Sequence, residues 1–165
     1  MTIQPDSGSR RFPLSASVIL KKSQGAGRWT LQQWTLAGVL LIQPSSVIQM
    51  GRNSESEWVH HRYDLRISVH KNCCESYYQN LCSDTPKLFV ICRLDENRIM
   101  QPIQITVDCD EATAYMEADD TVFFHPMPKS VVSWLQNFVV DFYRPQPSRK
   151  RRRQDWKIGS ARHES

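Results

Sequence analysis

The sequence has 165 residues, which favours one domain and is long enough to bury a core. Hydrophobic residues make up 40% and charged residues 23%, a globular composition that excludes collagen-like, fibrous and wholly disordered proteins. The net charge of +4 is unevenly distributed. Residues 144–165 carry eight Lys or Arg against two acidic residues, whereas residues 1–143 carry thirteen against fifteen. The basic excess therefore belongs to a C-terminal appendage and not to the body of the protein.

The composition divides the chain into three parts. We expect a flexible N-terminus over residues 1–11, a single α+β domain over residues 12–143 and a flexible basic tail over residues 144–165. The first part is polar and contains Pro and Gly, and the last begins where Pro, Ser and Arg replace the apolar residues.

Most of the domain carries strand signals. Alternation of apolar and polar residues places one face of a strand on a core and the other in water. The segment 88–92 is instead apolar at every position, which predicts a central strand that is covered on both faces. In chain order, the predicted strands lie at 14–20, 34–42, 63–69, 88–92, 103–107 and 121–124.

Helix signals are fewer. Asn72 is a candidate cap for a short helix, and Asp108 with Glu111 resembles a capping box that opens another. Pro128 suits the first position of a C-terminal helix that ends before Pro145. Its apolar stripe consists of Val131, Trp134, Leu135, Phe138 and Phe142.

Strands and helices do not alternate regularly along the chain. The sequence therefore predicts an α+β fold, in which a long C-terminal helix packs on a mostly antiparallel sheet of about five or six strands. The longest uncharged stretch has an apolar centre of only residues 37–42, too short for a membrane span. We expect a cytoplasmic protein.

Chemistry-bearing motifs are not evident. The five cysteines lie at 73, 74, 82, 92 and 109 without a Cys-x-x-Cys pair, which favours reduced thiols. A serine nucleophile elbow and a phosphate-binding glycine loop are also missing from the sequence. We therefore expect no catalytic residue, no metal site, no cofactor and no enzymatic activity.

Two features are candidates for binding. The adjacent cations Arg149, Lys150, Arg151, Arg152 and Arg153 repel one another unless an anion neutralises them. Their partner is nucleic acid, an anionic membrane surface or an acidic protein, unless the cluster only solubilises the chain. Trp29 and Trp34 form either a recognition surface or part of the core and its rim.

Short motifs, taken in order, resemble an uncharacterised bacterial family, a domain of unknown function often encoded beside formate dehydrogenase accessory genes. The resemblance covers about residues 13–153. Its landmarks are Trp29 to Trp34 with Val39-Leu40, Leu65–His70, Tyr78-x-Asn80-Leu81, Pro86-x-x-Phe89-Val90, Pro102 with Ile105-Thr106-Val107, Glu111-Ala112 with Tyr115, Pro126-Met127-Pro128, Trp134, Phe138-Val139 and Arg149–Arg153.

The resemblance implies a process and no catalytic residue. It implies a non-enzymatic accessory protein that supports assembly or maturation of a molybdenum or tungsten formate dehydrogenase. Its partners would be the subunits or maturation factors of that enzyme. The alternative from the residues themselves is binding of nucleic acid or another polyanion through Arg149–Arg153.

Overall fold

The computed structural model describes residues 8–24, 32–42 and 58–145. The expected tail over residues 144–165 lies almost wholly outside these ranges, as does most of the segment 1–11. The first described strand begins at Ser9. The elements in chain order are β1 (Ser9–Gln24), β2 (Gln32–Ile42), β3 (Trp58–His70), a 3-10 helix (Lys71–Cys73), α1 (Cys74–Leu81), β4 (Lys87–Leu94), β5 (Met100–Thr106), α2 (Cys109–Glu117), β6 (Thr121–Pro126) and α3 (Lys129–Phe142).

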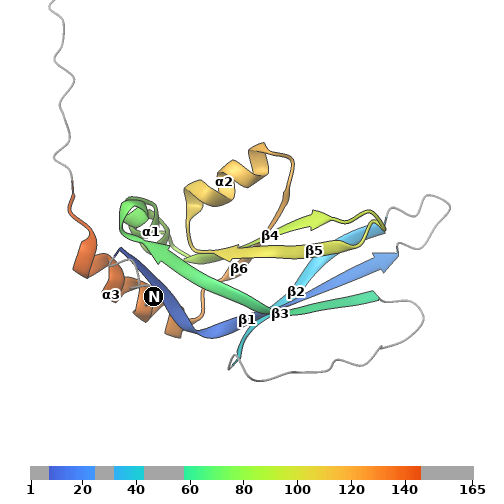
Figure 1. The fold of residues 1–165 in the computed structure, drawn as a ribbon, viewed down its shortest axis with the longest axis horizontal. Helices are drawn as coiled ribbons and strands as arrows, with labels where there is room; N and C mark the ends of the chain where they lie inside the picture. The colour runs from blue at the N-terminus through green and yellow to red at the C-terminus, as the bar shows by residue number, and fades with distance from the viewer. Residues whose placement is uncertain (1–7, 25–31, 43–57, 146–165) are drawn as a thin grey trace, which may run out of the picture.

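The strands form two antiparallel sheets of three strands each. Their orders are β2-β1-β3 and β5-β4-β6, so the central strands are β1 and β4. Strand β3 lies beside β5, and β2 lies beside β6, without ladder hydrogen bonds between the two sheets in the described part of the chain. The two sheets therefore enclose a common interior (Figure 1).

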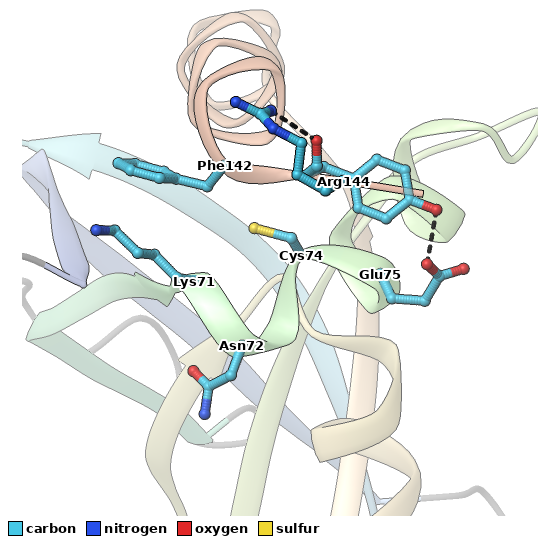
Figure 2. Close-up of a pocket in the computed structure, with 7 residues that line it drawn as sticks. Lys71, Asn72, Cys74, Glu75, Phe142 and Arg144 are labelled. Carbon is cyan, nitrogen blue, oxygen red and sulfur yellow. Dashed lines mark hydrogen bonds between the residues drawn. The ribbon is translucent and has the colours of Figure 1, made fainter. Parts of the chain in front are cut away.

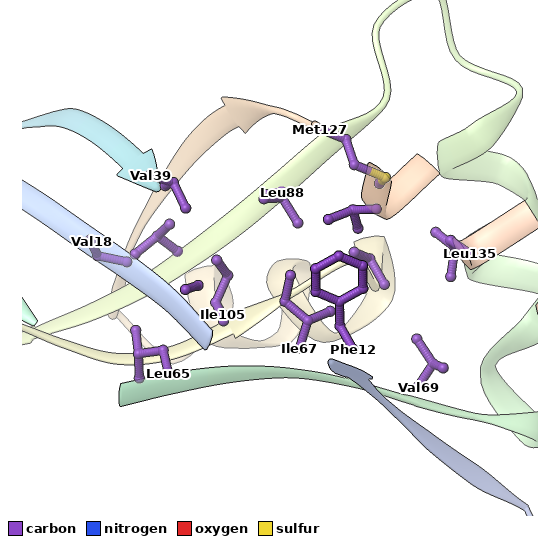
Figure 3. Packing of buried hydrophobic residues seen from close by; sticks show 14 of the residues in the cluster. Phe12, Val18, Val39, Leu65, Ile67, Val69, Leu88, Ile105, Met127 and Leu135 are labelled. Carbon is purple, nitrogen blue, oxygen red and sulfur yellow. The ribbon is translucent and has the colours of Figure 1, made fainter. Parts of the chain in front are cut away.

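That interior is lined by alternate residues of both sheets. Val18, Ile67 and Leu88 are fully buried and come from β1, β3 and β4 respectively. Figure 3 shows such side chains from opposite sheets packed against one another, with Leu135 of α3 beside them. Full burial of a large aliphatic side chain contributes about 1.5–3 kcal/mol, so these contacts dominate the stability of the domain.

Strand β4 confirms the expectation of a strand covered on both faces. Residues 88–92 are all buried. Helix α2 contacts β4 and β6, so it covers the face that turns away from the interior (Figure 1). Phe89 and Ile91, which alternate with the interior residues, are therefore buried as well.

Helix α3 has 14 residues and lies with α1 at one end of the two sheets (Figure 1). It buries Val131, Leu135, Phe138 and Val139, and the ring of Trp134 meets Phe12 of β1 edge to face at 5.3 Å. The predicted stripe therefore faces the interior. Pro128 was predicted as the first helical residue but lies one position before the helix, which begins at Lys129.

The predicted architecture was wrong in two respects. The strands do not form one sheet of five or six strands, and no long C-terminal helix covers such a sheet. Alternation identifies the buried face of each strand, but a second sheet can cover that face as well as a helix can.

The capping predictions had different outcomes. The Asp108 side chain accepts hydrogen bonds from the backbone N–H groups of Asp110 and Glu111, so the predicted cap of α2 is confirmed. The predicted cap at Asn72 is wrong, because α1 begins after Cys73 and no side chain caps it.

Within the described ranges, no helix is long and apolar enough to span a bilayer.

Packing of α3 on the interior leads to a first prediction. Leu135→Ala should lower the free energy of unfolding by about 2–5 kcal/mol, because Leu135 is fully buried and the truncation leaves a cavity. Val140→Ala, on the same helix but 76% exposed, should change it by less than about 0.5 kcal/mol. Urea unfolding followed by circular dichroism measures both values, and equal effects would contradict the placement of α3.

Candidate functional site

The residues predicted from the sequence are only partly described by the structure. Trp29 and the cluster Arg149–Arg153 lie outside the described ranges. Trp34 lies on β2, where it is half-buried and packs against the core. The Lys22 ammonium lies 5.6 Å from the centre of its ring. Trp34 therefore belongs to the rim of the core.

A hollow of about 610 Å³ lies between the start of α1 and the end of α3 (Figure 2). We call it the α1–α3 pocket. It is formed because the 3-10 helix that follows β3 and the last residues of α3 meet at the same end of the domain. Its lining residues are Lys71, Asn72, Cys74, Glu75, Phe142, Tyr143 and Arg144.

Cations gather around one aromatic ring of this pocket. The Lys71 ammonium lies 4.4 Å from the centre of the Phe142 ring, and the Arg10 guanidinium carbon lies 5.1 Å from it. Such cation–π contacts contribute about 0.5–1 kcal/mol each at exposed sites. Arg10 also pairs with Asp141 at 3.0 Å, and Arg144 lies exposed at the pocket rim.

Tyr143, which lines the same pocket, pairs with Tyr78, which lies outside the set of lining residues. The rings of Tyr78 and Tyr143 stack with centres 4.8 Å apart and an interplanar angle of 18°. The Tyr143 hydroxyl donates a hydrogen bond of 2.6 Å to Oε2 of Glu75 (Figure 2). This bond to the carboxylate raises the pKa of Tyr143 to about 12. Tyr78 is 43% exposed, so the pair presents an aromatic surface to solvent.

A second hollow, of about 470 Å³, lies between β3 and β5, and we call it the β3–β5 groove. Its lining residues are Arg66, Ser68, His70, Cys73, Tyr77, Gln104, Ile105, Thr106, Asp108 and Glu111. Oδ1 of Asp108 accepts hydrogen bonds from the Ser76 hydroxyl at 2.6 Å and from two backbone N–H groups of α2. The Tyr77 hydroxyl accepts one from the His70 backbone N–H at 3.1 Å. These buried polar groups connect both helices to the sheets.

The five cysteines of the protein are unpaired, and the surroundings of Cys73, Cys74, Cys92 and Cys109 raise the pKa of their thiols. Burial raises the pKa of Cys73, and hydrogen bonding to Asp108 raises it further. Burial raises the pKa of Cys109 as well, and burial alone raises that of Cys92 to about 12. A thiolate is the form that attacks substrates and binds metals, so these environments disfavour both roles. In the described ranges, no three His, Cys, Asp or Glu side chains are arranged to hold a metal ion.

A third hollow, of about 280 Å³, lies on the outer face of the second sheet beside α2, where polar residues of α1 and the loop after it meet three apolar side chains, Phe89, Met116 and Phe124. Phe124 is 53% exposed and Met116 is 41% exposed, while Phe89 beneath them is buried. The two phenylalanine rings meet edge to face at 5.7 Å, and the Lys87 ammonium lies 5.7 Å from the Phe124 ring. We call Phe89, Met116 and Phe124, with Lys87 at their edge, the Phe124 patch.

Neither aromatic surface was predicted from the sequence. Phe142, Tyr143 and Arg144 follow one another directly, and this succession of two aromatic residues and one basic residue was a signal for the α1–α3 pocket. Tyr78 gave no such signal, because only the fold brings α1 next to the end of α3. Phe124 was expected in a strand, but the pattern did not show which face of the strand α2 leaves open.

Comparison with known proteins gives one match. Residues 15–152 match the family described as "Protein of unknown function (DUF3305)". No curated protein matches the chain, and no solved structure matches it.

The state of the thiols leads to a second prediction. With iodoacetamide at neutral pH, exposed Cys82 should react first, and Cys73 should react faster only as the pH rises through its elevated pKa. Asp108→Asn removes the negative charge that raises this pKa and should speed the reaction of Cys73 at a fixed pH. Peptide mass spectrometry measures each rate, and a Cys73 that reacts ahead of Cys82 at neutral pH would contradict the assignment.

Proposed function

The chain belongs to the DUF3305 family, and from this premise we propose that it is a non-enzymatic binding protein of the bacterial cytoplasm. Its process is assembly or maturation of a molybdenum or tungsten formate dehydrogenase, in which it binds subunits or maturation factors of that enzyme. The resemblance of the sequence to domains encoded beside formate dehydrogenase accessory genes supports the choice of process.

The Phe124 patch is the observation that carries the binding role. Exposed aromatic side chains around a hollow with an apolar floor are typical centres of protein interfaces. Phe124 and Met116 expose apolar surface there, while buried Phe89 forms the floor. The Lys87 ammonium beside Phe124 supplies one positive charge at the edge. The patch therefore suits a partner segment that inserts an apolar side chain next to an acidic one.

The polar groups of the β3–β5 groove support binding over catalysis. Asp108 accepts three hydrogen bonds that hold α1 and α2 in place, and Tyr77 accepts one from the backbone of β3. Raised pKa values keep the nearby Cys73 thiol neutral. These side chains have structural partners, and their chemistry is that of a stabilising network.

A third prediction tests the partner surface. Phe124→Ala should weaken binding to purified formate dehydrogenase subunits or maturation factors at least about fivefold, because truncation removes the interface centre. Leu94→Ala is the matched control. Leu94 is also about half exposed, but it lies at the end of β4, whereas the Phe124 patch contains Lys87 and Phe89 at the start of β4. Biolayer interferometry with the immobilised protein measures both affinities. Wild-type protein that binds none of these components, or two variants that bind equally, would contradict the proposal.

Binding of a polyanion through Arg149–Arg153 is the second candidate function, and the α1–α3 pocket favours it. Arg144, only five residues before Arg149, lines that pocket together with Lys71. The basic cluster therefore follows directly after a cationic end of the folded domain. The phosphate or sulfate groups of one polymer can therefore pair with the cations of the pocket and with those of the cluster.

A fourth prediction tests this candidate. The full chain with all five residues Arg149–Arg153 replaced by Gln should elute from immobilised heparin at clearly lower salt than the wild type, because fewer counterions are released. Elution at an unchanged salt concentration would show that the cluster does not bind polyanions.

A further inference from the structure

The geometry points to the α1–α3 pocket and its tyrosine pair as a binding site for single-stranded nucleic acid. This inference rests on the second candidate function and gives it a ligand class and a folded site. Single-stranded nucleic acid is bound by cations that pair with phosphates and by aromatic rings on which bases stack. The end of the domain that carries α1 and α3 offers both within one pocket and its border.

The aromatic part of the site is the stack of Tyr78 on Tyr143. Tyr143 is held from two sides, because its ring stacks at 4.8 Å and its hydroxyl donates to Glu75 at 2.6 Å. A ring that is already fixed loses little conformational entropy when a base stacks on the pair. Tyr78 is 43% exposed, so the part of its ring that Tyr143 leaves uncovered is available to a base.

The cationic part consists of Lys71, Arg10 and Arg144. The first two contact the ring of Phe142, and the third lies at the pocket rim. Two carboxylates oppose them: Asp141 pairs with Arg10, and Glu75 accepts the Tyr143 hydrogen bond. These three cations and two carboxylates leave an excess of one positive charge. The Glu75 carboxylate orients the Tyr143 ring through their hydrogen bond.

The cations of the pocket provide affinity that depends on salt, and the tyrosine pair provides the preference for unpaired bases.

The tyrosine pair separates single strands from other polyanions. In a duplex the base faces are covered by neighbouring base pairs, so a duplex engages the cations and leaves Tyr78 unused. An acidic polypeptide or heparin likewise has charges but no base to stack. A contribution from the aromatic ring of Tyr78 is therefore the property that only single-stranded nucleic acid explains.

A fifth prediction follows. Fluorescence anisotropy of the full chain with a labelled oligouridylate of about 12 nucleotides should show a loss of affinity of about fivefold or more for Tyr78→Leu. Tyr78→Phe, which keeps the ring, should retain wild-type affinity. Lys71→Gln and Arg144→Gln should each lower the slope of log affinity against log salt by about 0.7. Lys129→Gln, at the opposite end of α3, is the charge-matched control and should leave affinity and slope unchanged.

Three outcomes would overturn the site. One is equal affinity of the Tyr78→Leu and Tyr78→Phe variants for the oligouridylate. The second is binding of a duplex of the same length as tightly as the single strand, and the third is equally effective competition by a polyglutamate of matched charge. Replacement of Arg149–Arg153 distinguishes the two proposals. If it weakens heparin binding while Tyr78→Leu has no effect on oligouridylate, polyanion binding stands and this site fails; if no polyanion binds at all, both fail.

Discussion

Burial of two facing apolar surfaces is the constraint on which the structure depends. Each three-stranded sheet turns an apolar face toward the other sheet, and contact between these two faces keeps most of the interior from water. Val18 and Ile67 on one side and Leu88 on the other are fully buried as a result. Two stacked sheets leave their ends open, and α3 closes one of them with Leu135 and Phe138. The position of α3 is therefore a consequence of the same apolar contact.

That closure also creates the α1–α3 pocket. Because α3 packs on the interior through Leu135 and Phe138, its last residues come to lie next to Lys71 and α1. The polar groups of the β3–β5 groove also hold α1 in position, because Asp108 connects Ser76 of α1 to the start of α2. The packing of α3 and the hydrogen bonds of Asp108 thus determine which aromatic and basic side chains meet at the α1–α3 pocket. The Phe124 patch arises similarly, where α2 covers part of the second sheet and leaves β6 partly open.

The local features of the fold were accessible from the sequence, and the assembly of its parts was not. Alternation identified four strands, the continuous apolar run 88–92 identified β4, and the Asp108 cap of α2 followed from residue type and spacing. The division into two sheets did not follow, because an apolar strand face gives no information about what covers it. Asn72 failed as a cap because the 3-10 helix carries the chain past it before α1 begins.

The candidate site shows the same division. The cluster Arg149–Arg153 was evident as a run of charge. The surface around Tyr78, in contrast, depends on contacts between α1 and α3, and 47 residues of sequence separate the end of α1 at Leu81 from the start of α3 at Lys129. Trp34 was singled out because tryptophan is frequent at interfaces, and its half-buried ring packs against the core and lies near the Lys22 ammonium. Residue type alone did not show this packing.

The central claim is that the folded part of the chain binds through two separate aromatic surfaces. Two-dimensional NMR of the isotopically labelled full chain, titrated with oligouridylate and then with a formate dehydrogenase component, tests it most directly. We expect the oligouridylate to shift the signals of Tyr78, Tyr143 and Lys71, and the formate dehydrogenase component to shift those of Met116 and Phe124. When both ligands are present, both sets of signals should be shifted. Shifts spread across the β-sheet core, or the same residues responding to both ligands, would contradict it.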